Sequence, residues 1–426
     1  MKNICSFFSS LREIALLLKG RIPYQLVIQY TDRCNAQCPQ CGMRASENYR
    51  RSTLSMDKVK RIIDYAATQG VKAISFTGGE PFLYFDEIVS LLKYAKEAGI
   101  KYTRTGTNGF MFTESDSVNY RSRITKIAES LADAGIYTLW ISLDSAVPAL
   151  HEAMRGLPGV VAGIEKALPI FHQHGIYPSA NLGINRNIAE FPLDGISSSD
   201  VYHAFRSAFE KYYRFVIDLG FTMVNACYPM SVQNSNHTTL NPVYRAASGN
   251  RLVQFSSLEK AAVFRALFDA IPQFRSKIRI FTPRSSLSAL IRQYLLGEAY
   301  CYPCRGGREF FFIDARDGNA YPCGYRGHEN LGDFRELTRD KITIQETCRK
   351  CDWECFRDPS ELLGPLMDLC TRPAVFIKKI LHDRHCMKLW YHDLKYFSAC
   401  NFFNGTIPPD YQKLSRFSFN TKLARS

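Results

Sequence analysis

The feature that most constrains this fold is a helix that ends at a glycine and is followed at once by an apolar strand, repeated along the chain. Glycine ends helices readily because it adopts left-handed backbone angles. The predicted helices end at Gly70, Gly99, Gly135 and Gly175. The predicted strands are 24–30, 71–76, 100–105, 136–143, 177–184 and 221–226. Strands that alternate with helices in this way predict a parallel sheet.

Six such strands are too few for a closed eight-stranded barrel, so we expect an α/β fold with an open, partial (β/α)6 barrel. Functional residues of such folds lie at the carboxyl ends of the strands. The rest of the chain divides by composition. The expected parts are a helical extension (1–23), the barrel (24–230), a helical connector (231–300), a small cysteine-rich domain (301–360) and a basic tail (361–426).

Charge and the apolar pattern limit the partners of the chain. The formal net charge is +14, from 54 basic and 40 acidic residues. This charge suits the binding of nucleic acid, anionic lipid or an acidic ligand. The alternative is a basic surface that has no specific partner. No export signal is recognisable, and no apolar run approaches the roughly 20 residues of a membrane helix. We therefore expect a cytoplasmic protein whose 14 cysteines do not form disulfides.

Three of those cysteines form a tight group directly after the first predicted strand. Cys34, Cys38 and Cys41 lie in TDRCNAQCPQC, residues 31–41. Three thiolates can hold three irons of a four-iron cluster and leave the fourth iron open to an exchangeable ligand. The alternative is a zinc site that is completed by a distant residue.

Short polar residues follow the other predicted strands. They are Thr77–Pro81, Asn108, Ser142 with Asp144, and Asn185. If the strand assignments are right, all of them lie on the same rim as the cysteines. Each could separately be a helix cap or a turn residue.

The segments CNAQCPQC, ISFTGGEPFL, GTNG and ISLDS together resemble the radical S-adenosylmethionine (radical SAM) enzymes over roughly residues 24–230. The resemblance implies a [4Fe-4S] cluster on Cys34, Cys38 and Cys41. It also implies that S-adenosylmethionine chelates the fourth iron and is cleaved by one electron to a 5′-deoxyadenosyl radical, which abstracts hydrogen from a substrate. The electron donor would be of flavodoxin or ferredoxin type.

The same resemblance implies a set of residues that bind S-adenosylmethionine. The segment Gly78-Gly79-Glu80 matches the one that binds the methionine amino group. The remaining residues implied for the ribose and the carboxylate are Asn108, Ser142, Asp144 and Asn185, with Arg155 at a position that pairs with a carboxylate. One departure is Gln40, where the family usually has an aromatic residue near the adenine. We expect His151 to be a helix-surface residue, and no catalytic residue is identified.

The second cysteine group surrounds a predicted β-hairpin. EFFFIDARDGNAYPC has a tight-turn signal at Asp317-Gly318 between two short strands. Sulfur ligands at the base of a hairpin suit zinc or iron–sulfur, and a zinc ribbon is the simpler interpretation. The candidate ligands are Cys301, Cys304, Cys323, Cys348, Cys351 and Cys355.

This region resembles the SPASM or twitch domains of radical SAM enzymes, although the later cysteines depart from the full SPASM spacing. The resemblance implies one auxiliary [4Fe-4S] cluster held by Cys304 and Cys323. Two of Cys348, Cys351 and Cys355 would complete it. Cys301 would instead serve a second cluster, or a redox or structural role.

The sequence therefore predicts a radical SAM enzyme that acts on a peptide or protein side chain or on a small molecule. The auxiliary cluster would aid net oxidation or bond formation. The basic tail 361–426 suggests peripheral membrane contact or a lipid-linked substrate, and no nucleic-acid partner is expected. The alternative function is a non-enzymatic zinc protein that binds nucleic acid through its positive charge.

Overall fold

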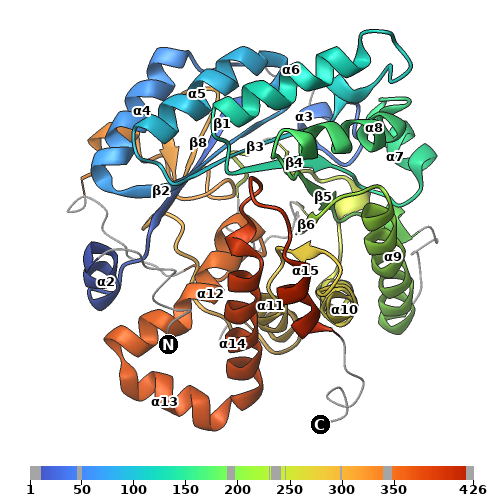
Figure 1. The fold of residues 1–426 in the computed structure, drawn as a ribbon. Coiled ribbons are helices and arrows are strands. Elements are labelled where there is room, and N and C mark those ends of the chain that lie inside the picture. The colour runs from blue at the N-terminus through green and yellow to red at the C-terminus, as the bar shows by residue number, and fades with distance from the viewer. Residues whose placement is uncertain are drawn as a thin grey trace.

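Figure 1 shows a curved sheet with helices on both of its faces. The computed structural model describes residues 11–45, 50–189, 197–229, 231, 241–244, 246–297, 300–338 and 348–418. Within them, nine strands form one sheet in the order β7-β6-β5-β4-β3-β2-β1-β8-β9. Strands β1 to β6 lie in sequence order and pair in parallel, and the sheet does not close on itself. The predicted partial (β/α)6 barrel is confirmed.

The six central strands agree with the predicted ones to within a few residues. They are β1 (Tyr24–Thr31), β2 (Val71–Gly78), β3 (Tyr102–Thr107), β4 (Thr138–Ser142), β5 (Ser179–Gly183) and β6 (Met223–Cys227). The register places Ser142 of β4 opposite Asn181 of β5, and Asn181 opposite Asn225 of β6. A row of polar side chains therefore crosses three neighbouring strands.

The helices between these strands cover the outer, convex face of the sheet (Figure 1). They are α4 (Met56–Gln69), α5 (Phe85–Glu97), α6 (Tyr120–Asp133), α8 (Val160–Gln173) and α9 (Ser198–Asp218). Ser55 caps α4 by accepting the backbone N–H of Lys58, and Gly70 ends it with φ of 80°. Apolar side chains such as Ile62, Leu91 and Phe171 are fully buried between these helices and the sheet.

Three further strands extend the sheet beyond the predicted six. β7 (Arg279–Ile280) joins β6. β8 (Phe310–Ile313) pairs in parallel with β1 and antiparallel with β9 (Ala320–Tyr321). The predicted hairpin is therefore present, with Gly318 at φ of 68° in its turn. It is attached to the main sheet, because the unpaired edge of β1 accepts the apolar strand β8.

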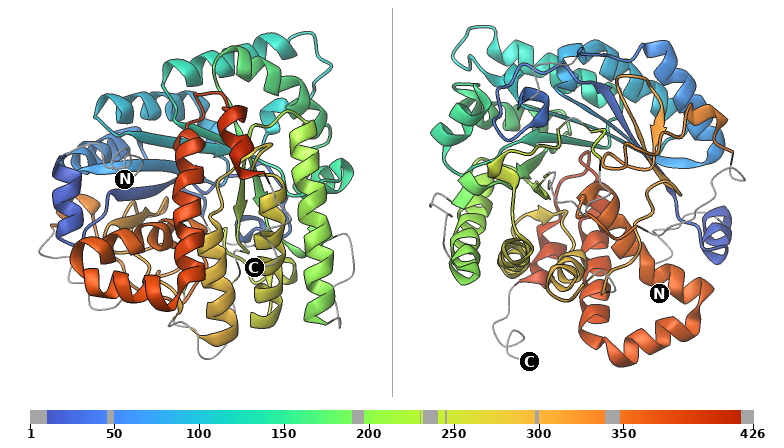
Figure 2. Two further views of the ribbon diagram at one scale, coloured as in Figure 1. Left: turned by 60° about the horizontal axis from the view of Figure 1, so that its bottom comes forward. Right: turned by 180° about the vertical axis from the view of Figure 1, so that it is seen from behind.

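The concave face of the sheet, here called the inner face, is covered by helices from the C-terminal half (Figures 1 and 2). These are α10 (Ser257–Ala270), α11 (Arg284–Leu296), α12 (Glu354–Thr371) and α14 (Arg384–Ala399). The remaining helices are α2 (Leu11–Leu18), α3 (Gly42–Ala45), α7 (Pro148–Arg155), α13 (Pro373–His382) and α15 (Tyr411–Leu414). Short 3-10 turns are η1 (Pro81–Tyr84), η2 (Phe110–Phe112), η3 (Arg186–Ala189), η4 (Arg251–Val253), η5 (Ile271–Gln273), η7 (Phe334–Glu336), η8 (Asn401–Phe403) and η9 (Ser415–Phe417).

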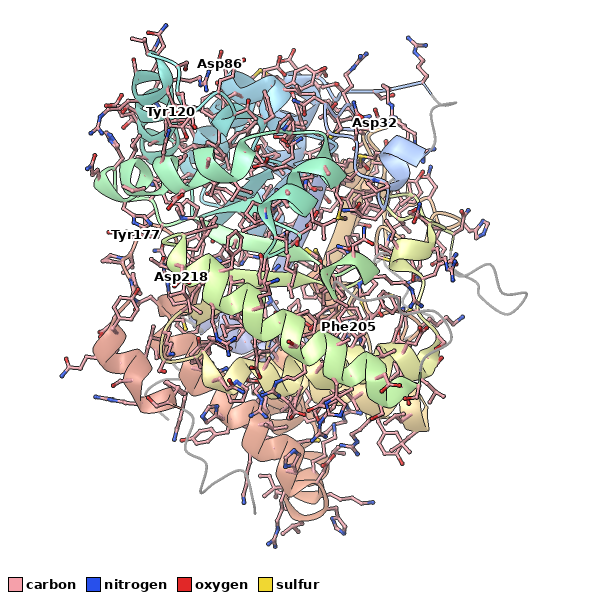
Figure 3. The ribbon with its side chains drawn as sticks, turned by 90° about the vertical axis from the view of Figure 1, so that its right-hand side faces the viewer. Asp32, Asp86, Tyr120, Tyr177, Phe205 and Asp218 are labelled. Atoms are coloured by element: carbon pink, nitrogen blue, oxygen red, sulfur yellow. The ribbon has the colours of Figure 1, made fainter. Side chains whose placement is uncertain are left out.

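The segment predicted as a basic tail packs closely on the barrel. The predicted boundary at residue 360 falls inside α12, which continues to Thr371. The segment around Gly405 then crosses the amino ends of β4 and β5. There Gly405 donates its N–H to the carbonyl of Tyr137 at 2.7 Å and accepts the N–H of Tyr177 at 2.6 Å; Tyr177 is labelled in Figure 3. In the described part of the chain, no helix is both long enough and apolar enough to cross a bilayer.

A buried ion pair joins this C-terminal region to the barrel. The carboxylate of Asp393 on α14 pairs with Arg275 at 2.6 Å and accepts the backbone N–H of Ser285 at 2.7 Å. Replacing Asp393 with Ala leaves the Arg275 guanidinium buried without its partner. We expect the free energy of unfolding to fall by about 3–5 kcal/mol, as measured by urea denaturation.

The control is Asp116→Ala, which breaks an ion pair of the same 2.6 Å length with Lys166 at an exposed site. Its cost should stay below about 1 kcal/mol. Equal losses from the two variants would show that the tail contributes little to the stability of the barrel.

Candidate functional site

Residues 31–41, here called the cysteine loop, leave the carboxyl end of β1. Cys34 is exposed, Cys38 is buried and Cys41 is half-buried. Burial raises the pKa of the Cys38 thiol to about 12, and desolvation by the surrounding protein atoms raises the pKa of the Cys34 thiol, although that residue as a whole is exposed. Thiols of this kind stay protonated unless a metal or another positive charge compensates the thiolate.

The start of the cysteine loop is fixed by Asp32, which is labelled in Figure 3. Its carboxylate accepts the backbone N–H of Ser52 at 2.7 Å, and the Arg51 guanidinium donates to its carbonyl at 3.1 Å. The end of β1 is therefore attached to the segment that leads into α4.

Gly78 and Gly79 contact the cysteine loop directly. A Cβ on Gly78 would lie 2.2 Å from the carbonyl oxygen of Thr31, and one on Gly79 would lie 2.2 Å from that of Arg33. The N–H of Gly79 donates to the Thr31 carbonyl at 2.8 Å, and the N–H of Glu80 donates to the Arg33 carbonyl at 2.8 Å. Only glycine permits this approach, so the glycine pair determines where the cysteine loop lies.

The Glu80 carboxylate is almost fully buried and joins the ends of β2 and β3. It accepts the backbone N–H of Asn108 at 2.6 Å and that of Phe82 at 2.9 Å. Burial raises its pKa to about 7. Asn108 in turn donates to the side chain of Asn35 in the cysteine loop at 2.9 Å, and its amide nitrogen lies 3.8 Å from the Cys34 sulfur.

Asp144 is the centre of a buried polar network after β4. Its carboxylate forms an ion pair with Arg155 at 2.6 Å, accepts the side-chain amide of Gln40 at 3.2 Å and accepts the backbone N–H of Gly183 at 3.0 Å. Gln40, which stands where the family usually has an aromatic residue, thus connects the cysteine loop to β4.

The prediction of an exposed His151 is wrong. The ring is fully buried, and its Nδ1 accepts the backbone N–H of Asp144 at 3.1 Å. Burial lowers the pKa of His151 to about 4, so the ring is neutral near pH 7. The helix α7 turns this residue inward because its other buried residues, Met154 and Arg155, also face the barrel.

The two remaining predicted residues differ in their surroundings. Asn185 is fully buried and is occupied with local contacts, donating to the Gly183 carbonyl at 2.8 Å and accepting the N–H of Asn187 at 3.0 Å. Ser142 is half-buried in the polar row that it shares with Asn181 and Asn225. The predicted rim residues therefore lie close together. The Asn185 side chain stabilises its own turn through these local hydrogen bonds.

A second cluster on the inner face was not anticipated from the sequence. The inner polar cluster consists of Arg104, Asn181, Asn225, Cys227, Glu354 and Cys355. Asn181 accepts from the Asn225 amide at 3.1 Å and from the Cys227 sulfur at 3.3 Å. The sequence did carry a signal for this cluster, because polar residues occupy alternate positions of otherwise apolar strands. Alternate side chains of a strand share one face of the sheet.

The helix α12 completes this cluster from the opposite side. The Cys355 sulfur donates to the Glu354 carboxylate at 3.6 Å, and the backbone N–H of Tyr228 donates to the same carboxylate at 3.3 Å. The Gln25 amide of β1 reaches the Cys355 carbonyl at 3.2 Å. Burial raises the pKa of Glu354 to about 7, so this carboxyl group can exchange a proton near neutral pH.

The second cysteine group surrounds a small pocket. Its lining includes Cys304, Cys323, Cys348 and Cys351, together with Arg326, Trp353 and Phe356; these four cysteines are called the four-cysteine pocket. The N–H of Cys304 donates to the Cys348 carbonyl at 2.7 Å. The sulfurs of Cys304 and Cys323 accept backbone N–H groups of Gly306 and Tyr325 at 3.5 and 3.4 Å. Hydrogen bonds of this kind tune cluster-bound sulfurs.

The other two predicted ligands lie outside this pocket. Cys355 belongs to the inner polar cluster, while Cys301 is buried next to Arg349, whose guanidinium donates to its carbonyl at 3.0 Å. Among the described residues, no three His, Cys, Asp or Glu side chains converge closely enough to hold a single metal ion. All-sulfur ligation suits zinc or an iron–sulfur cluster, and the four thiols that line the four-cysteine pocket are a ligand set of this kind.

The glycine contact gives a direct test of the cysteine loop. In Gly79→Ala, the new Cβ meets the Arg33 carbonyl and must displace the loop. We expect anaerobically reconstituted protein to lose the iron of the loop, about four atoms per chain, as measured by iron analysis. Gly249→Ala is the control, since its Cβ would have its nearest neighbour 3.9 Å away. Full iron content in Gly79→Ala would contradict the role of the contact.

Asp358, on α12 behind the inner polar cluster, gives a prediction for pH. It accepts hydrogen bonds from Ser286 at 2.5 Å and Tyr228 at 3.2 Å, and burial raises its pKa to about 8. The unfolded chain loses this proton near pH 4, whereas the folded chain keeps it until about pH 8, so stability falls as the pH rises between these values.

We expect Asp358→Asn to remove this decline. The loss of unfolding free energy between pH 5 and pH 8 should shrink by about 2–4 kcal/mol, measured by urea titrations at both pH values. Asp57→Asn, at an exposed position of α4, is the control. Parallel pH profiles of Asp358→Asn and the wild type would refute the assignment.

Comparison with known proteins identifies the barrel. Residues 28–185 match the Radical SAM superfamily. AdoMet-dependent heme synthase of Methanosarcina barkeri is 24% identical over 352 residues, which are 80% of this chain and 87% of that protein. Probable GTP 3′,8-cyclase of Sulfolobus acidocaldarius is 36% identical over 192 residues, which are 41% of this chain and 56% of the cyclase.

The fold has a counterpart among solved structures. The crystal structure of Streptococcus suis SuiB bound to S-adenosylmethionine superposes with a TM-score of 0.50 and 17% identity, covering 79% of this chain and 70% of that one. The sequence matches, the cysteine loop at the end of β1 and the partial barrel agree with one another. Residues 28–185 therefore form a radical SAM domain, and the relatives that share this similarity are enzymes.

Proposed function

We propose that this enzyme abstracts a hydrogen atom from a substrate held between the cysteine loop and the inner polar cluster. The observation that carries the proposal is that the cysteine loop and the polar row of β4 to β6 lie at the carboxyl edge of the same sheet. Bound there, a [4Fe-4S] cluster and S-adenosylmethionine supply the 5′-deoxyadenosyl radical by reductive cleavage.

We propose that Cys34, Cys38 and Cys41 hold this cluster, and that Gly78, Gly79 and Glu80 line the site of the methionine amino group. Ser142 and Asp144 face the same edge and suit the ribose and carboxylate. Arg155 neutralises Asp144 at 2.6 Å, and the buried neutral His151 accepts the Asp144 N–H at 3.1 Å. These contacts hold the polar groups in place before the ligand arrives, which lowers the cost of binding.

The inner polar cluster is proposed to receive the substrate. The positive charge of Arg104 offsets part of the rise that burial gives to the pKa of the Cys355 thiol. The Arg104 guanidinium lies over the rings of Tyr102 and Phe281, and among the described residues no acidic side chain is hydrogen-bonded to it. It suits an anionic group of the substrate. The Glu354 carboxyl group, with its pKa of about 7, is placed to accept a proton when the substrate is oxidised.

The four-cysteine pocket is proposed to hold one auxiliary [4Fe-4S] cluster, with Cys304, Cys323, Cys348 and Cys351 as ligands. Its support is the convergence of these four thiols on one pocket. The pocket is joined to the inner polar cluster by a single short segment, because Cys351 precedes Glu354 by three residues. An electron from the substrate would therefore have a short route to the auxiliary cluster.

The enzyme needs a reductant and a substrate. We propose a flavodoxin or ferredoxin as the reductant, and a cytoplasmic location. The substrate is a peptide or protein side chain or a small molecule, and the basic C-terminal helices favour an anionic or lipid-linked molecule within the second class. That no nucleic acid binds remains a prediction.

The decisive experiment is anaerobic reconstitution with iron and sulfide, followed by a reductant and S-adenosylmethionine. We expect 5′-deoxyadenosine from the wild type and none from a variant with Cys34, Cys38 and Cys41 all changed to Ala. That variant should keep about four irons per chain at the four-cysteine pocket. Bound zinc and intact S-adenosylmethionine would overturn the proposal and favour the zinc protein with a basic, nucleic-acid-binding surface.

The auxiliary site is tested in the same assay with a matched pair of cysteines. Cys351→Ala should lose about four irons while 5′-deoxyadenosine is still formed in the absence of substrate. Cys301→Ala, outside the pocket, should keep the wild-type iron content. The opposite pattern would remove Cys351 from the proposed ligand set.

A further inference from the structure

The helix α13 is unusually exposed for so apolar a segment. It has the sequence PAVFIKKILH, and none of its ten residues is buried. Four large aliphatic side chains on it are exposed: Val375, Ile377, Ile380 and Leu381, with Ile377 and Leu381 each 56% exposed. Exposed aliphatic side chains that are gathered in one patch mark a site of protein–protein or membrane interaction.

The exposed side chains form a ridge with a defined direction. Ile377, Ile380 and Leu381 are spaced by three and four residues, so they share one face of the helix. The two half-buried residues attach α13 to the protein. Phe376 makes an edge-to-face contact with Trp390, and Lys379 pairs with Asp368 at 3.0 Å. The ridge therefore points outward while the helix is held firmly from behind.

Positive charge surrounds the ridge. Residues 372–388 contain five Lys or Arg and a single acidic residue, Asp383. That acid is paired with Arg292 at 2.6 Å, and the nearby Asp368 is buried between Arg372 and Lys379. The surface around α13 is thus an apolar ridge among cations. Asp368 and Asp383, the described acidic residues beside it, are both paired with cations.

The position of α13 leaves this surface accessible. Figures 1 and 2 show α13 at the periphery, where the chain turns back from α12 to α14, away from the sheet. The helix α2 packs on α12 on the same side of the molecule, and its Leu18 is 61% exposed. The apolar surface is therefore remote from the cysteine loop.

We propose that α13 is a membrane-docking helix, whose ridge of Ile377, Ile380 and Leu381 enters the headgroup region of an anionic bilayer. Short amphipathic helices bind bilayers in this way when their apolar face is flanked by Lys and Arg. The inference rests on the exposure and charge of α13 and is independent of the proposed radical chemistry.

Charge complementarity favours a bilayer over a second copy of the chain. In a symmetric dimer through this face, the cations of one α13 would meet those of the other, and like charges placed opposite each other repel. An anionic bilayer offers the apolar interior and the negative headgroups at the same surface.

The test uses reconstituted full-length protein and sedimentation with vesicles of phosphatidylglycerol or phosphatidylcholine. We expect binding to phosphatidylglycerol vesicles that weakens strongly between 0.1 M and about 0.5 M salt, and little binding to phosphatidylcholine. The double variant Ile377→Glu with Leu381→Glu should reduce the bound fraction by about tenfold or more.

The control is the double variant Val118→Glu with Leu258→Glu, which makes the same change of charge at two exposed aliphatic positions, one in the loop before α6 and one on α10. It should bind vesicles like the wild type. Because all four positions are exposed, iron content, 5′-deoxyadenosine formation and the thermal midpoint should be unchanged in both variants.

Three results would overturn the proposal. The first is the absence of vesicle binding by the wild type. The second is an equal loss of binding in both double variants, which would mean adsorption by net charge alone. The third is light scattering that shows a dimer in the wild type and a monomer in the α13 variant without vesicle binding, which would make this face a contact between copies.

Discussion

The contact between two glycines and the backbone of the cysteine loop is the constraint on which the site depends. Gly78 ends β2 and Gly79 follows it, and the backbone of Thr31 and Arg33 occupies the space where their side chains would be. The two backbone hydrogen bonds of 2.8 Å hold the loop against the neighbouring strand. These backbone contacts fix the position of the loop without using the cysteine sulfurs. Glu80 and Asn108 then extend the same arrangement to β3.

The helix α12 connects the barrel to the C-terminal half of the molecule. Its first residue, Glu354, reaches β6, and the carbonyl of Cys355 accepts a hydrogen bond from β1. Its preceding turn carries Cys351 of the four-cysteine pocket. A displacement of this helix would therefore change the inner polar cluster and the pocket together. The buried Arg357, paired with Glu361 at 2.8 Å on the same helix, keeps that segment rigid.

Local sequence signals predicted the elements of the barrel and the grouping of the site. Glycines after helices marked the βα units, Asp317-Gly318 marked the hairpin, and the polar residues after strands came together as expected. Contacts between distant segments could not be predicted in this way. The pairing of β8 with β1, the reach of Glu354 to β6 and the burial of His151 depend on which surfaces meet, and periodicity carries no such information. Four of the six later cysteines converge on one pocket for the same reason: the hairpin and the segment before α12 are brought together only by the folded chain.

The pairing of β8 with β1 has a consequence for biosynthesis. One edge of β1 has no partner until residue 313 has been made, which is nearly three hundred residues after β1 itself. Chains fold from the amino end as they are synthesised, so a partial barrel with an open apolar edge precedes the finished enzyme. Such edges invite pairing with other chains. Until β8 pairs with β1, the growing chain therefore carries an exposed strand edge at which it can associate with another copy.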